Sequence, residues 1–153
     1  MDNSDLVRNK LFNVCVNFVN NRINTLQSAI AHAQASAASE TKSSMGDKYE
    51  TARSMAQQEA DHSRSQLADA MALKNVLDQC PMQPPGEMIT TGSIVYTNHR
   101  NYFIAIAIGP VEIDDQTFLI ISRMSPVGRL LMGKRAGDQF TWQDKQIIIL
   151  RVQ

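Results

Sequence analysis

Proline is absent from the first 80 residues of this 153-residue chain, and glycine occurs there once, at Gly46. Both residue types interrupt helices, so their scarcity permits long, unbroken helices in this part of the chain. The first three of the five prolines follow together, in Pro81-Met82-Gln83-Pro84-Pro85-Gly86. That run indicates a linker, and we predict two domains, at residues 1–80 and 81–153.

The chain also lacks an excess of charge and a long apolar run. Fifteen basic residues balance fifteen acidic ones, which disfavours a protein held to nucleic acid mainly by phosphate contacts. No segment reaches the roughly 18 apolar residues that cross a bilayer, and the polar, acidic start differs from a secretion signal. We therefore expect a cytoplasmic protein with no membrane partner.

Motifs for metal binding and for self-contained catalysis are missing as well. Cys15 and Cys80 form no CxxC or Cys/His metal spacing, and no Ser-His-acid or Cys-His grouping appears at a recognisable motif. His32 and His62 fall on opposite helical segments without a third ligand. These absences favour a non-enzymatic factor, with no cofactor of its own, over an enzyme.

In the first half, apolar residues recur in alternating steps of four and three, which is typical of helices that pack lengthwise. The first run comprises Phe12, Val16, Val19, Ile23, Leu26, Ile30, Ala33 and Ala37, and the second comprises Tyr49, Ala52, Ala56, Ala60, Ser63, Leu67, Ala70 and Leu77. Residues 40–46 between them are rich in hydroxyl groups and end in glycine. The sequence predicts an antiparallel coiled-coil hairpin with arms of about 35 residues, or roughly 50 Å. Because the hairpin satisfies its own apolar stripe, we expect a monomer.

Residues 81–153 alternate between β-branched runs and turn residues. The pattern predicts strands at 93–97, 102–108, 117–122, 139–142 and 146–152. A short helix is expected at 127–132, where Pro126 precedes its first turn and Gly133 follows its end. Four or five antiparallel strands with one short helix make a compact unit, so the fold class is α+β.

Two motifs in this second domain resemble the C-terminal domain of the Gre transcript cleavage factors. They are TGSIV at 91–95 and SPVGRLLMGKRAGD at 125–138, and the YETAR segment at 49–53 resembles part of the family's coiled coil. The resemblance covers nearly the whole chain. It implies an FKBP-like C-terminal domain, and it implies RNA polymerase as the partner. In the family this domain sits at the rim of the polymerase's secondary channel and the coiled coil reaches the active site, so nucleic acid is met only within that complex.

At the tip of the hairpin the sequence departs from the family, whose acidic residues there help to hold a second Mg²⁺ for cleavage of backtracked RNA. Alignment on the YETAR segment places Lys42 and Met45 at those positions, and neither side chain binds Mg²⁺. The nearby acids are Glu40, Asp47 and Glu50. Glu40 and Asp47 would form a substitute pair if they met across the tip. Alternatively, Asp47 balances the positive end of a helix and Glu40 is solvated, which leaves a secondary-channel regulator without cleavage activity.

Ser125 and Pro126 match positions that the family uses near its polymerase-facing surface. The same two residues suit the start of a helix, where serine caps and proline fits the first turn. Met124, Leu130 and Leu131 are candidates for either a docking patch or the core, and for the two leucines we favour the core. Both roles of the Ser-Pro pair are compatible with each other.

Two further hypotheses concern other side chains. Arg8, Lys10 and Arg22 either line a face that meets RNA or form the solvated side of an amphipathic helix. The FKBP-like fold raises the alternative of a prolyl isomerase or chaperone, which needs an apolar pocket lined by several aromatic rings. Aromatic residues are only 6% of the chain, and we expect Phe140 and Trp142 to pack on the sheet instead.

Overall fold

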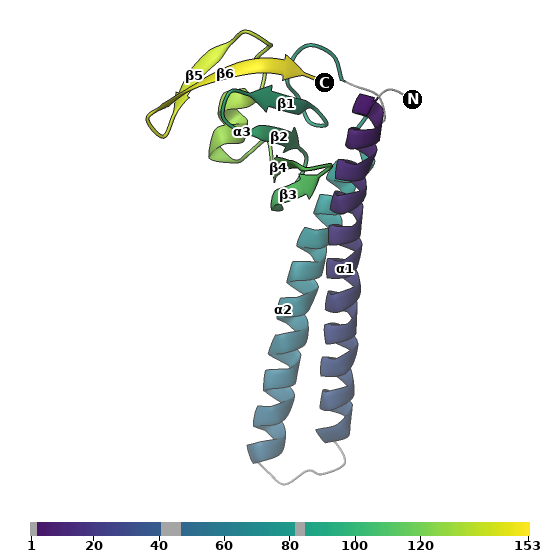
Figure 1. Ribbon diagram of the computed structural model, residues 1–153. Helices are drawn as coiled ribbons and strands as arrows, with labels where there is room; N and C mark the ends of the chain where they lie inside the picture. The colour runs from purple at the N-terminus through teal and green to yellow at the C-terminus, as the bar shows by residue number, and fades with distance from the viewer. Residues whose placement is uncertain (1–2, 41–46, 82–84) are drawn as a thin grey trace. The chain divides into compact units, whose positions relative to one another are not determined.

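The computed structural model describes residues 3–40, 47–81 and 85–153 (Figure 1). Its contacts divide the chain into two compact units, one of Met1–Val16 with Asn75–Gln153 and one of Asn17–Lys74. Helices α1 (Asn3–Glu40) and α2 (Asp47–Asp78) contribute residues to both units. The predicted domain boundary near residue 81 stays a prediction. Among the described helices, none is long and apolar enough to cross a membrane.

The unit of residues 17–74 consists of most of α1 and most of α2, which run antiparallel to each other as expected from the sequence (Figure 1). A buried stripe runs along each helix: Val19, Ile23, Leu26 and Ala33 on α1, and Ala56, Ala60, Ser63 and Ala70 on α2. All eight belong to the predicted heptad positions, so the helical hairpin is confirmed. The buried side chains shorten from leucine and isoleucine to alanine toward residues 41–46.

The other unit holds a six-stranded sheet with the order β3-β4-β2-β1-β6-β5. Its strands are β1 (Ile94–Thr97), β2 (Asn101–Ile104), β3 (Gly109–Ile113), β4 (Gln116–Ile121), β5 (Gln139–Trp142) and β6 (Lys145–Val152). The short helix α3 (Pro126–Leu131) lies between β4 and β5 in the chain. The predicted α+β class is therefore confirmed.

Two details of the predicted sheet are wrong. The sheet is mixed rather than antiparallel, because β2 pairs with β4 in parallel register, with Tyr102 opposite Leu119. The expected four or five strands are six, and the strand that the sequence analysis missed is β3. Its second residue is Pro110, which has no N–H for a ladder bond, and β3 is an edge strand, where proline is tolerated.

A tight turn sets the register of the last two strands. Gln143 and Asp144 have φ values of 48° and 64°, the left-handed pair found in two-residue hairpin turns whose twist matches that of the flanking strands. Lys145 is already paired with Trp142. The loop is thus one residue shorter than the three-residue turn predicted from the sequence.

The sheet is apolar on both faces. One face carries a cluster with α3, made of Ile89, Val95, Tyr102, Ile104, Ile121, Val127, Leu131 and Ile149. Phe140 and Trp142 pack against this cluster, as predicted. The alternate strand positions, including Phe103 and Phe118, are also fully buried.

The first turns of α1 belong to this unit and contact the sheet. Phe12 of α1 and Phe103 of β2 line the same small cavity, and Lys10 forms an ion pair with Asp114 at 2.7 Å. Residues near the two ends of the chain also meet, since the Gln153 side-chain amide donates a hydrogen bond to Ser4 Oγ at 2.9 Å. Residues separated by up to 149 positions in sequence therefore complete one unit.

Candidate functional site

The loop between β4 and α3 is fixed by a network of serine hydroxyls. Ser125 is the N-cap of α3: its Oγ accepts a hydrogen bond from the Gly128 N–H at 3.1 Å and donates one to the Ser122 carbonyl at 2.7 Å. Pro126 occupies the first helical position, where its missing N–H and fixed φ cost nothing. The helix-initiating role of Ser125 and Pro126 is thus present, and it orients the side chains around it.

Those side chains divide into a buried row and an exposed row. Val127 and Leu131 are buried against the sheet, whereas Met124 and Leu130 keep 59% and 36% of their surface exposed. The expected core role is correct for Leu131 and wrong for Leu130, which lies at the surface. Arg123, Pro126 and Arg129 are exposed as well. We call Arg123, Met124, Pro126, Arg129 and Leu130 the α3 surface.

A groove of about 330 Å³ adjoins this surface. Ser125 lines it together with the loop before β3 and the end of β4, including Ala107, Ile108 and Leu119. The wall is mainly apolar. Next to two exposed arginines, such a groove suits a protein partner with apolar side chains surrounded by acidic ones.

The residues predicted from the sequence in this region include Ser125, Pro126, Met124 and Leu130, but not the two arginines. Arg123 and Arg129 lie on either side of the Ser-Pro pair, and a cation on each side of a helix start was the available signal. Charged residues flanking a helix are common, so the spacing alone did not distinguish them.

The candidate metal residues at the tip of the hairpin are not brought together by any described contact. Glu40 is the last residue of α1 and Asp47 the first of α2, but their side chains, like all of Lys42 and Met45, lie outside the described residues. Glu50 is described and is exposed. Within the described part of the chain, no group of three or more His, Cys, Asp or Glu side chains is placed to hold a metal ion.

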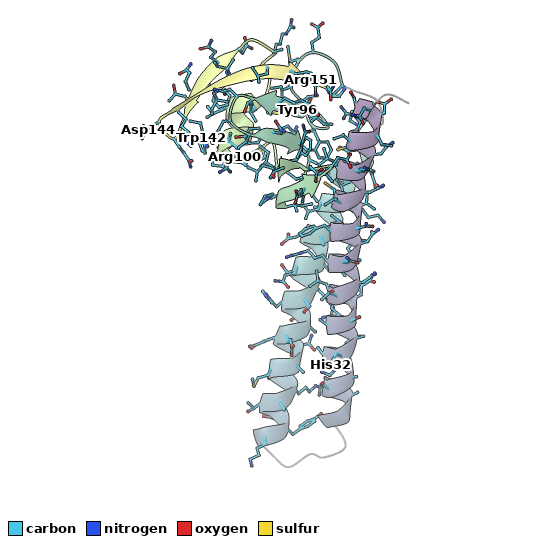
Figure 2. The ribbon with its side chains drawn as sticks, in the orientation of Figure 1. His32, Tyr96, Arg100, Trp142, Asp144 and Arg151 are labelled. Carbon is cyan, nitrogen blue, oxygen red and sulfur yellow. The ribbon has the colours of Figure 1, made fainter. Side chains whose placement is uncertain are left out.

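The remaining candidates are the basic residues considered for an RNA-facing surface and the histidine considered as a metal ligand. Arg8 is only 5% exposed, so it cannot belong to an RNA-facing surface. Lys10 pairs with Asp114, and Arg22 is exposed on α1. His32 is likewise exposed on α1 (Figure 2).

The two cysteines are buried and unpaired, as small apolar residues would be. Burial, with a smaller contribution from Cys80, raises the pKa of Cys15 to about 12. Burial also raises the pKa of Cys80, against an opposing effect of Arg8. Thiols that stay protonated at neutral pH are poor nucleophiles and poor metal ligands.

One hollow beside the sheet lacks the aromatic lining that a prolyl isomerase requires. A hollow of about 440 Å³ is lined by His99, Arg100, Asn101, Pro110, Thr117 and Leu119, with no aromatic ring among them. The pKa of His99 is lowered by partial desolvation and by the cations Lys145 and Arg100. Elsewhere on the sheet, the Arg151 guanidinium lies over the Tyr96 ring, 4.1 Å from the ring centroid (Figure 2).

Comparison with known protein families agrees with the resemblance seen in the sequence. Residues 84–152 match the family described as transcription elongation factor, GreA/GreB, C-terminal domain. The C-terminal part of the chain, residues 84–152, thus forms a GreA/GreB C-terminal domain. A comparison with curated protein sequences gave no match.

Proposed function

We propose that this protein binds RNA polymerase through the α3 surface and inserts the helical hairpin into the polymerase's secondary channel. The GreA/GreB C-terminal domain at residues 84–152 carries the proposal. The helical hairpin supports it, because two helices with short side chains between them make a narrow element that fits a pore. An FKBP-like topology, a monomeric state and a cytoplasmic location remain expectations of the same proposal.

The α3 surface supplies the contacts that docking requires. Arginine and large apolar residues dominate the binding energy of protein interfaces, and this surface presents Arg123, Arg129, Met124 and Leu130 around the capped start of α3. The serine network holds these side chains in place before binding, which lowers the entropy lost on association.

Reversing the charge of Arg129 is expected to weaken binding to core RNA polymerase by about tenfold or more, because a buried interfacial cation then becomes an anion. The measurement is competition against an authentic Gre factor for core polymerase, with Arg129→Glu compared with the unchanged protein. Arg100→Glu is the matched control, since Arg100 is an exposed arginine beside the separate hollow on the sheet. Equal competition by all three proteins would remove the α3 surface from the proposal, and failure of the unchanged protein to compete would remove the polymerase.

At the tip we favour occupation of the channel without stimulated cleavage. Lys42 and Met45 stand where the family carries its acidic pair, and neither supplies an oxygen ligand for Mg²⁺. The alternative is that Glu40 and Asp47, with Glu50 nearby, hold the polymerase's second Mg²⁺ and its water for a two-metal hydrolysis.

Stalled elongation complexes with backtracked RNA distinguish the two activities. We expect the Mg²⁺-dependent cleavage rate to stay at the polymerase's intrinsic value when the protein is added. A rate increase that is lost in Glu40→Ala/Asp47→Ala, while competition for the polymerase is retained, would instead establish the alternative. The control variant is Glu59→Ala, which removes an exposed acid from the same hairpin at a distance in sequence from the tip.

A further inference from the structure

Arg8 is a buried cation with no ion-pair partner among the described residues. Its side chain is 5% exposed, and Nη1 donates a hydrogen bond to the Gly92 carbonyl. Nη2 is buried and has no hydrogen-bond partner among the described residues. The ion pairs of the described residues join Lys10 to Asp114 and Arg64 to Asp61, so no described carboxylate lies within ion-pair distance of Arg8.

A small cavity adjoins this guanidinium. It measures about 10 Å³, which is room for one water-sized occupant. Its wall is made by Arg8, Asn9, Phe12, Cys80, Gly92 and Phe103, with Pro81 closing one side. Gly92 has a φ of +95°, and a Cβ there would lie 3.1 Å from the Pro81 ring, so the absence of a side chain at Gly92 allows the two segments to close around the cavity.

The lining determines which occupant the cavity favours. An unpaired buried charge is costly, and a single backbone carbonyl offsets only part of that cost. The lining contains no carboxylate, and Cys80 stays protonated because its pKa is raised. An anion in the cavity would therefore meet the Arg8 cation and no negatively charged lining residue, since Asp5, whose charge also acts on Arg8, does not line the cavity.

We propose that the cavity beside Arg8 binds one monatomic anion, of which chloride is the abundant example. Room for one water-sized occupant favours a single-atom anion over phosphate or a carboxylate, which carry several heavy atoms. The bound halide would neutralise Arg8 and so stabilise the junction of α1, the end of α2 and the start of β1. This proposal is independent of polymerase binding.

The test compares the full chain in potassium chloride and in potassium gluconate at equal ionic strength, so that general screening is the same in both. At a chloride concentration ten times the dissociation constant, the midpoint of thermal unfolding should lie about 3–6 °C higher than in gluconate. Chloride-35 NMR should show excess line broadening that bromide removes and gluconate leaves unchanged.

Arg8→Met should abolish both the chloride-dependent midpoint and the excess broadening. Lys10→Met is the matched control: it removes the same charge two residues away on α1, where the ammonium pairs with Asp114, and it should retain both effects. If Arg8→Met does not fold, the bromide competition with the unchanged protein decides. Equal midpoints in the two salts, or broadening that bromide does not reduce, would overturn the proposal and leave water as the occupant.

Discussion

Phe118→Ala is expected to lower the free energy of unfolding by about 3–5 kcal/mol, since truncating a buried phenylalanine removes transfer energy and leaves a cavity. Phe118 is 0% exposed on β4. Its ring meets Tyr96 edge-to-face, with centroids 6.0 Å apart and planes at 76°, and that geometry adds to the loss. Urea unfolding followed by circular dichroism measures the change.

Phe18→Ala is the matched control for this substitution. Phe18 lies on α1 with 36% of its surface exposed, so the same chemical change should cost much less there. If the two variants lost similar stability, the sheet would not be packed around Phe118 as the structure shows.

Alkaline pH is expected to destabilise the protein through its buried thiols. An unfolded chain releases the Cys15 proton near pH 9, whereas the folded chain holds it to about pH 12. Between these values the unfolded state binds fewer protons, so the free energy of unfolding falls by about 1.4 kcal/mol per pH unit for this group. Below pH 9 the contribution of the thiol is fully present. Urea midpoints measured from pH 8 to pH 11 check the decline.

Cys15→Ala should flatten this pH dependence while lowering stability slightly at every pH. Part of the slope should remain, because burial also raises the pKa of Cys80 and of Tyr102. Parallel curves for the variant and the unchanged protein would show that Cys15 does not keep its proton through folding.

The helical hairpin was predictable because its signal is local and repeated. Heptad spacing of apolar residues and the lack of proline identify two helices, and the buried positions Val19, Leu26, Ala60 and Ala70 follow from that spacing. The α3 cap was predictable for the same reason, since Ser125, Pro126 and Gly133 mark its start and end within nine residues.

The missed features depend on contacts between distant segments. The parallel pairing of β2 with β4 leaves no periodic signature, and β3 is masked by its glycine and proline. The buried guanidinium of Arg8 donates its hydrogen bond to the carbonyl of Gly92, which lies 84 positions later in the chain. A charged residue on a helix ordinarily faces water, so only the tertiary structure distinguishes Arg8 from Lys10.

The hydrogen bond from Gln153 to Ser4 and the ion pair of Lys10 with Asp114 have a consequence for how the chain folds. Contacts between residues more than 100 positions apart form late and slowly, because a long loop must close before they contribute. During synthesis the first turns of α1 leave the ribosome long before their partners on the sheet exist. Until β2 emerges, Phe12 lacks Phe103, which lines the same cavity in the finished fold, so the nascent chain exposes apolar surface of α1 to chaperones for much of its translation.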